Sequence, residues 1–275
     1  MTLARLGDFG AARDYFERAL STFRRIESDE GEAMAYNNLG LVAKNSGDLA
    51  GALRYLERAL RINERLGSYP RVTGNSLNLG IVRFKLGEWD IAHEYLERCL
   101  VMARDTDDTL ARTNALNSLA CLHRRRRDFA AAELALDESL EISTRHGHAR
   151  ERVLSQEFRG ELEVDRGRLA EAQALYADAL RAAEELAAEG DLVLELVRRM
   201  GDLHLAQGRL EEAEACGRRA LELAHRQHDR LEEATAWRLL GLLGVTGIAT
   251  RNSPTISLQV ISISSRCVGW ENIRG

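Results

Sequence analysis

The sequence is poor in residues that interrupt a chain. Its 275 residues include two prolines and 22 glycines, which argues against a collagen-like or low-complexity protein. Aromatic residues make up only 5% of the chain, while Leu, Ala, Glu and Arg dominate it. These four side chains lose little conformational freedom in a helix, so the composition favours helical structure. With 45% hydrophobic residues, the chain has enough apolar material for a large core.

Cysteine is equally scarce. The four cysteines, Cys99, Cys121, Cys216 and Cys267, lie far apart and form no CxxC pair. A chain of this length with so few cysteines is not expected to depend on disulfides. We expect these residues to be small buried apolar groups in a reducing cytoplasm.

Long hydrophobic runs are absent as well. The most apolar stretch, "LLGLLGV" at 239–245, is far shorter than the roughly 20 residues that span a bilayer. The N-terminal segment is interrupted by charges and does not resemble a signal peptide. The net charge of −5 provides no overall field that attracts nucleic acid. The composition therefore predicts a cytoplasmic protein with no membrane partner.

Signatures of catalysis are missing too. The histidine motifs "HGH" at 146–148 and "HRQH" at 225–228 lack the paired His and helical Glu of a zinc site. The sequence contains no GxSxG, no phosphate loop and no GxGxxG after a strand. We therefore expect no enzyme activity, no metal site and no cofactor.

What the sequence does contain is a repeat. "GDFGAARDYFERAL" at 7–20 returns as "GDLAGALRYLERAL" at 47–60, and related copies begin at 87, 127, 167 and 208. The period is 40 residues with one insertion. A second pattern lies between these copies and ends on a small residue. These residues are Gly40, Gly80, Ala120, Gly160, Gly201 and Gly241.

Both patterns have helical spacing. Within 47–66, apolar residues recur at intervals of three and four and form one stripe. The expected N-cap residues are Asp8, Asp48, Asp128, Asp191 and Asp229, and Pro70 lies near a helix start. Each unit is thus a helix, a turn and a second helix, stable only when the next unit covers its apolar face. The small residues are expected at close helix contacts, and the space between one pair and the next is expected to be filled by Leu56, Leu96, Leu136 and Tyr176.

This pattern resembles the tetratricopeptide repeat family over about residues 1–244. The usual repeat has about 34 residues and a closing proline, whereas these units have 40 residues and no closing proline. The long form is similar to the arrays of kinesin light chains, spindle-orientation scaffolds and large bacterial regulators. The resemblance implies an all-α, right-handed superhelical solenoid of about twelve antiparallel helices, with an incomplete repeat at each end.

The resemblance also implies a function. In this family the first helices line a concave face that binds extended peptides, so we expect a non-catalytic protein- or peptide-binding scaffold, or the sensory segment of a larger bacterial regulator. The candidate peptide-binding residues are Asn37, Asn38, Lys44, Asn78, Lys85, Asn117, Arg124 and Arg125. Asparagine can bond both the N–H and the C=O of an extended peptide, and the basic groups can meet a carboxylate.

Other interpretations remain open at this stage. The same asparagines fit solvent-facing positions, and basic residues at helix C-termini are favoured by the helix dipole alone. The later first helices carry more acidic residues, so the face is expected to change from basic to acidic along the chain. A switch that binds a small peptide or metabolite is the first alternative function. Nucleic-acid contact through the arginines at 124–127 is a remote one.

The two ends differ from the rest. Residues 245–275 share nothing with the repeats and are rich in isoleucine, so we expect a disordered or non-native tail. The alternative is that this segment packs over the last helix. Neither end carries a protective terminal repeat. We therefore expect either a piece of a longer protein or a homo-oligomer formed through the end faces.

Overall fold

The computed structural model describes residues 9–252, and every regular element in that range is an α-helix. The twelve helices of the described chain are α2 (Phe9–Arg25), α3 (Asp29–Asn45), α4 (Leu49–Arg65), α5 (Tyr69–Lys85), α6 (Trp89–Asp105), α7 (Thr109–Arg125), α8 (Phe129–Arg145), α9 (Ala149–Asp165), α10 (Leu169–Leu186), α11 (Asp191–Ala206), α12 (Leu210–Gln227) and α13 (Arg230–Asn252). The predicted all-α array of about twelve helices is confirmed, and Asp8 lies outside the described residues.

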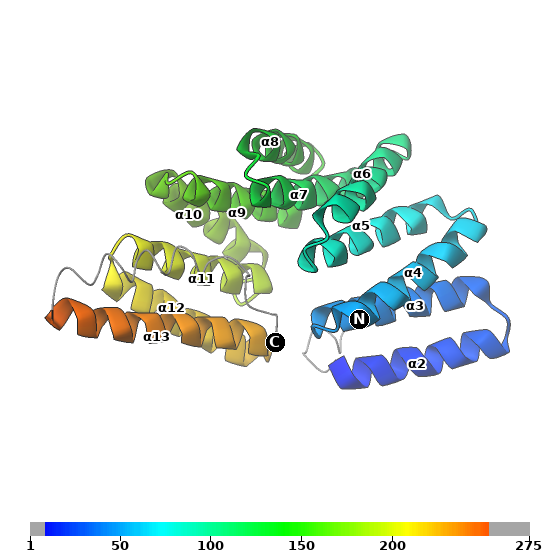
Figure 1. Cartoon of the computed structure of the whole chain (residues 1–275), viewed down its shortest axis with the longest axis horizontal. Helices are drawn as coiled ribbons and strands as arrows, with labels where there is room; N and C mark the ends of the chain where they lie inside the picture. The colour runs from blue at the N-terminus through cyan, green and yellow to red at the C-terminus, as the bar shows by residue number, and fades with distance from the viewer. Residues whose placement is uncertain (1–8, 253–275) are drawn as a thin grey trace. The chain divides into compact units, whose positions relative to one another are not determined.

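The chain divides into two compact units with the boundary between Phe158 and Arg159, inside α9. In the first unit, α3 packs on α4, α5 on α6 and α7 on α8, and each such hairpin also contacts the next (Figure 1). In the second unit, α11 packs against both α12 and α13. Successive helices run antiparallel because the turns between them, most of three residues and none longer than four, reverse the chain.

Aspartates at the helix starts explain where several helices begin. Asp48 accepts a hydrogen bond from Gly51 N at 2.8 Å, and Asp128 accepts one from Ala131 N at 3.1 Å. Asp229 accepts bonds from two backbone N–H groups of α13, both at 3.0 Å. The prediction for Asp191 is wrong, because Gly190 is the N-cap of α11 and Asp191 is already helical.

Small residues lie where paired helices approach closely. A Cβ atom at Gly40 would come within 2.6 Å of Leu56, and one at Gly80 within 2.7 Å of Leu96. Such distances are far inside van der Waals contact, so a larger residue at Gly40 or Gly80 would force the facing leucine to move. Leu56 of α4 meets Gly40 of α3 within its own hairpin, and it also belongs to a buried cluster with Val72, Leu79 and Val82 of α5, so it fills space between this hairpin and the next as the sequence predicts.

The predicted tail lies mostly outside the described residues. Helix α13 continues to Asn252, past the predicted boundary at 244, and residues 253–275 are not described. Among the helices that are described, none combines the length and the apolar character needed to cross a membrane. The same part of the chain contains no group of three or more His, Cys, Asp or Glu residues placed to hold a metal ion.

Candidate peptide-binding site

A hollow of about 180 Å³ lies among α3, α4 and α5, and we call it the α3–α5 hollow. The side chains that matter for its chemistry are Met34, Asn37, Asn63, Arg71, Asn75 and Asn78. Four of these six are asparagines, so the wall offers amide donors and acceptors rather than a continuous apolar surface.

Three of the asparagines are joined in a line across the helices. Asn63 Nδ2 donates to Asn75 Oδ1 at 2.7 Å, and Asn75 Nδ2 donates to Asn37 Oδ1 at 2.9 Å. Asn63 is only 2% exposed, and its Oδ1 accepts no hydrogen bond within the described part of the chain. A buried acceptor without a donor costs free energy. Because this oxygen is itself buried, an N–H group that enters the hollow reaches it only if neighbouring side chains move.

Two lysines lie beyond the asparagines on the same helices. Lys44 follows Asn37 by seven residues and Lys85 follows Asn78 by seven, which is close to two helical turns. Each lysine therefore lies on the same face of its helix as the asparagine before it. Burial, and then the charge of Lys85, lowers the pKa of Lys44 to about 8. Two positively charged groups thus lie about two turns beyond the asparagines on the same two helices, outside the lining of the hollow.

The structure separates the predicted site residues into groups. Asn37 and Asn78 line the hollow together, with half-buried Lys44 and exposed Lys85 further along the same two helices. Asn38 is half-buried and does not line the hollow.

Asn117 belongs to the interior instead. It is 3% exposed, and its Oδ1 accepts hydrogen bonds from the hydroxyls of Ser139 and Ser155, both at 2.8 Å. Its amide is therefore already used in joining α7 to α8 and α9. A peptide could reach this group only by displacing those bonds.

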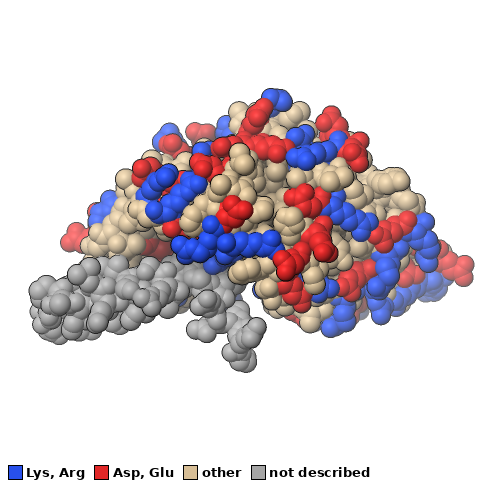
Figure 2. Space-filling view, turned by 45° about the horizontal axis from the view of Figure 1, so that its top comes forward, with Lys and Arg blue, Asp and Glu red and all other residues tan. Residues whose placement is uncertain are grey.

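The predicted basic cluster at 124–127 is largely engaged within the chain. Arg126 forms an ion pair with Asp90 at 2.5 Å, and Arg127 lies over the ring of Phe129 at 5.6 Å. Arg124 and Arg125 are half-buried and also have polar interactions of their own. Figure 2 shows positive and negative side chains interspersed on the face in view.

Sequence reasoning missed Asn63 and Asn75. The next repeat does contain a signal for them, because the positions 40 residues later are alanines, Ala103 for Asn63 and Ala115 for Asn75. An amide where the next repeat has a small apolar residue indicates a local polar function, provided that both residues lie in one place. Only the structure shows that they do.

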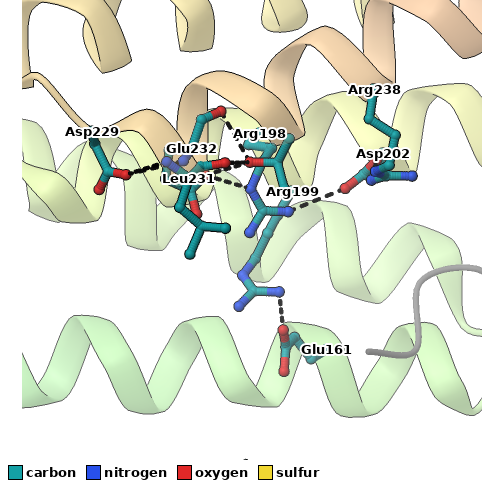
Figure 3. Close-up of polar contacts among 9 residues, drawn as sticks. Glu161, Arg198, Arg199, Asp202, Asp229, Leu231, Glu232 and Arg238 are labelled. Carbon is teal, nitrogen blue, oxygen red and sulfur yellow. Dashed lines mark hydrogen bonds and ion pairs between the residues drawn. The ribbon is translucent and has the colours of Figure 1, made fainter. Parts of the chain in front are cut away.

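In the second unit, contacts between the helices are made by charged side chains rather than by amides. Arg198 of α11 donates to Glu232 of α13 at 2.7 Å and pairs with Asp202 at 3.3 Å (Figure 3). Arg238 pairs with the same Asp202 at 3.0 Å, and Arg199 pairs with Glu161. The expected acidic face is therefore a network of ion pairs in these helices, with its carboxylates matched by arginines.

The charges of this network act strongly on Arg198. Burial alone would lower its pKa, but the negative charges of Glu232 and Asp202 outweigh burial and raise the pKa above the usual value. A guanidinium held in this way remains charged at all physiological pH values.

Comparison with known families agrees with the helical repeats. Residues 103–245 match the MalT-like TPR region model, and residues 1–65 match a tetratricopeptide repeat model. This chain belongs to the tetratricopeptide repeat family. Its 40-residue units are a long form of that repeat. No curated protein matches the sequence.

Several solved structures share the tetratricopeptide fold at low sequence identity. BtubC (BKLC) from P. vanneervenii is 20% identical, with a TM-score of 0.62, and the match covers 80% of this chain and 92% of that one. A Rap conjugation gene regulator of the plasmid pLS20, in complex with the Phr* peptide, is 11% identical with a TM-score of 0.69; coverage is 88% and 75%. The apo quorum sensor NprR from B. thuringiensis is 16% identical with a TM-score of 0.63, covering 84% and 65%.

Proposed function

We propose that this chain recognises an extended segment of a protein or peptide at the α3–α5 hollow and acts by binding rather than by catalysis. The observation that carries the proposal is the set of four asparagines, Asn37, Asn63, Asn75 and Asn78, that line the hollow. An extended peptide supplies backbone N–H and C=O groups that such amides can bond. The peptide complex of the Rap regulator supports such a role, because a related fold there holds a peptide.

The asparagines of the hollow and the two lysines beyond them define the ligand's chemistry. Asn78 supplies both a donor and an acceptor that can bond the peptide backbone without reading its sequence. Lys44 and Lys85 favour an acidic side chain or a terminal carboxylate at the far end. Because an anion beside Lys44 stabilises its charged form, binding of such a ligand near pH 8 takes up protons.

A peptide library displayed on phage tests the proposal on the full chain. We expect enriched peptides with an acidic residue or a free carboxylate, and Asn78→Ala should weaken their binding about tenfold. Asn45→Ala is the matched control, because Asn45 is exposed at the end of α3 and does not line the hollow.

Charge reversal separates the cationic end from the amides. Lys85→Glu should weaken binding of acidic peptides and reduce its salt dependence, whereas Arg54→Glu, on an exposed position of α4, should leave both unchanged. Peptides that bind all four variants with equal affinity, or a selection that enriches none, would contradict a site in this hollow.

A further inference from the structure

A second hollow, of about 400 Å³, lies among α2, α3 and α4, and we call it the α2–α4 hollow. Its wall includes Leu20, Arg24, Tyr36, Leu39, Tyr55 and Arg58. None of the residues that line it also lines the α3–α5 hollow. An inference drawn from it therefore does not rest on the function proposed above.

Two arginines converge on a single phenol in this hollow. Arg58 Nη1 donates to Tyr36 Oη at 3.0 Å, and Arg24 Nη2 donates to the same oxygen. The guanidinium carbons of Arg24 and Arg58 lie 5.5 and 5.6 Å from the centre of the Tyr36 ring. A phenol oxygen is a hydrogen-bond acceptor without the charge of a carboxylate, so it gives two positive charges a shared partner but no balancing charge.

The carboxylates around the pair balance it only in part. Arg24 lies 3.4 Å from Glu32, and Glu17 lines the hollow. Arg58 forms no ion pair with any carboxylate of the described chain, and Tyr36 is its hydrogen-bond partner there. Its charge thus remains available to an anion that enters from solvent.

The other repeats show what normally occupies these two positions. The residue 40 positions after Arg24 is Glu64, and the one 40 after Arg58 is Arg98; these form an ion pair at 2.6 Å. The next repeat pairs Arg104 with Glu138 at 3.2 Å.

A third pair follows in the second unit, where Glu184 meets Arg219 at 2.5 Å. In each of these repeats, the two positions carry opposite charges that join the second helix of one repeat to the second helix of the next. The α2–α4 site differs from these three by carrying two arginines, and Tyr36 stands where the next repeat has Ser76; the remaining repeat has Thr144 and Asp178 at the two positions.

We propose that Arg24, Tyr36 and Arg58 form a binding site for an oxyanion, phosphate or carboxylate, carried on an aromatic or apolar body. The two guanidinium groups offer forked N–H donors of the kind that bind both oxyanions, and the ligand supplies the negative charge that the other repeats have built in. The rings of Tyr36 and Tyr55 and the side chains of Leu20 and Leu39 provide contact for the attached body.

Titration calorimetry of the full chain with phenyl phosphate, inorganic phosphate and benzoate tests this site. We expect saturable binding of phenyl phosphate or benzoate, tighter than binding of inorganic phosphate because only the first two carry an aromatic ring. Preference for phenyl phosphate assigns a phosphorylated ligand, and preference for benzoate assigns a carboxylate ligand.

Two variants locate the binding. Arg24→Glu recreates the Glu–Arg arrangement of the next repeat, so it should fold normally while weakening anion binding by about tenfold or more. Arg58→Gln should weaken it similarly, whereas Arg61→Gln, on an exposed position of the same helix, should not. Circular dichroism during heating checks that each variant is folded.

Absence of saturable binding with all three probes, or equal binding by the wild type and Arg24→Glu, would overturn the proposal. Loss of peptide binding in Asn78→Ala with anion binding retained would show the two sites to be independent.

Discussion

In the first unit, the first helices of neighbouring repeats are joined mainly by neutral side chains, apart from the exposed pair of Arg71 with Glu30 at 3.8 Å, whereas in the second unit they are joined by ion pairs. Asn37 of α3 accepts from Asn75 of α5, and Asn117 of α7 accepts from Ser155 of α9. In the second unit, Arg199 of α11 pairs with Glu161 of α9, and Arg198 pairs with Glu232 of α13. In both units, these contacts join the first helix of one repeat to the first helix of the next.

The comparison shows that the repeat determines where a contact occurs but not which chemistry makes it. Allowing for the one inserted residue, Arg198 occupies the position of Asn37 and Asn117 in the repeat. Arg198 bonds Glu232, which lies 34 residues later, whereas Asn37 bonds Asn75, which lies 38 residues later. The longer arginine side chain thus reaches a carboxylate about one turn nearer the start of the next first helix. A neutral link is cheap to bury, while a buried ion pair is stable only when both partners are present.

The largest effect is expected from breaking the ionic link. Arg198→Met keeps the apolar stem but leaves Glu232 and Asp202 without the positive charge between them. Because the side chains of Arg198 and Glu232 are each only 14% exposed, we expect the free energy of unfolding to fall by about 3 kcal/mol. Urea denaturation measures the loss. Arg181→Met removes an ion pair with Asp178 that is mostly exposed, so it should cost less than about 0.5 kcal/mol. Equal losses in the two variants would show that the loss in Arg198→Met does not come from burial of its ion pair.

The neutral link should be weaker and should also be replaceable. Asn117→Ala leaves the hydroxyls of Ser139 and Ser155 without their common acceptor, and we expect a loss of about 2 kcal/mol in the same assay.

One repeat earlier, the same three positions are apolar, with Leu77, Cys99 and Ala115 packed in one cluster. The triple variant Asn117→Leu, Ser139→Cys, Ser155→Ala copies that cluster. It should lie within about 1 kcal/mol of wild type, because no buried polar group is left without a partner. A triple variant less stable than Asn117→Ala would show that the polar link cannot be exchanged.

Lys44 is a partly buried charge in the first unit that forms no ion pair with any residue from 9 to 252, in contrast to Arg198. Its pKa is lowered to about 8, so the folded chain gives up the proton more easily than the unfolded chain, whose lysines titrate near 10.4. Stability contributed by this site therefore rises with pH between about 8 and about 10.

Lys44→Met should raise the free energy of unfolding by about 1 kcal/mol near pH 7, and its advantage over wild type should shrink toward pH 10. Burial raises the pKa of Cys99 to about 12, which gives the opposite slope at high pH, but this contribution cancels in the difference between wild type and variant. An advantage that stays constant with pH would show that packing, rather than charge, is what the substitution improves.

The smallest effect concerns helix starts, which also differ between the units. Asp48 caps α4 through Gly51 N in the first unit, whereas α12 in the second unit begins at Arg209 with no side-chain cap. We expect Asp48→Ala to cost about 1 kcal/mol and Arg209→Ala less, because only the first removes a cap. Thermal unfolding compares them, and an equal or larger loss for Arg209→Ala would show that its bond to Gln173 matters more than the cap.

Much of the fold was predictable because it depends on local and repeated signals. The spacing of apolar residues gave the helices, the glycine and alanine positions gave their close contacts, and aspartates such as Asp48 and Asp128 gave their starts. Asp191 was placed wrongly because a glycine with suitable backbone geometry precedes it and needs no side chain to cap the helix.

The candidate site was predictable only in part. Asn37 and Asn78 were identified from the resemblance, and they do lie in one hollow. Asn117 shares the same sequence signal yet is buried, because two serines from α8 and α9 reach its oxygen. Whether an asparagine faces solvent or a neighbour depends on residues up to 38 positions away, which no local pattern contains.

By itself, the sequence determined the repeat, its helices and its family, since each of these follows from side-chain spacing that recurs every 40 residues. Only the tertiary structure decided which polar groups are consumed in joining helices and which remain for a ligand. The reason is physical: a hydrogen bond or an ion pair requires two groups within about 3 Å of each other, and that distance exists only after separate helices have packed together.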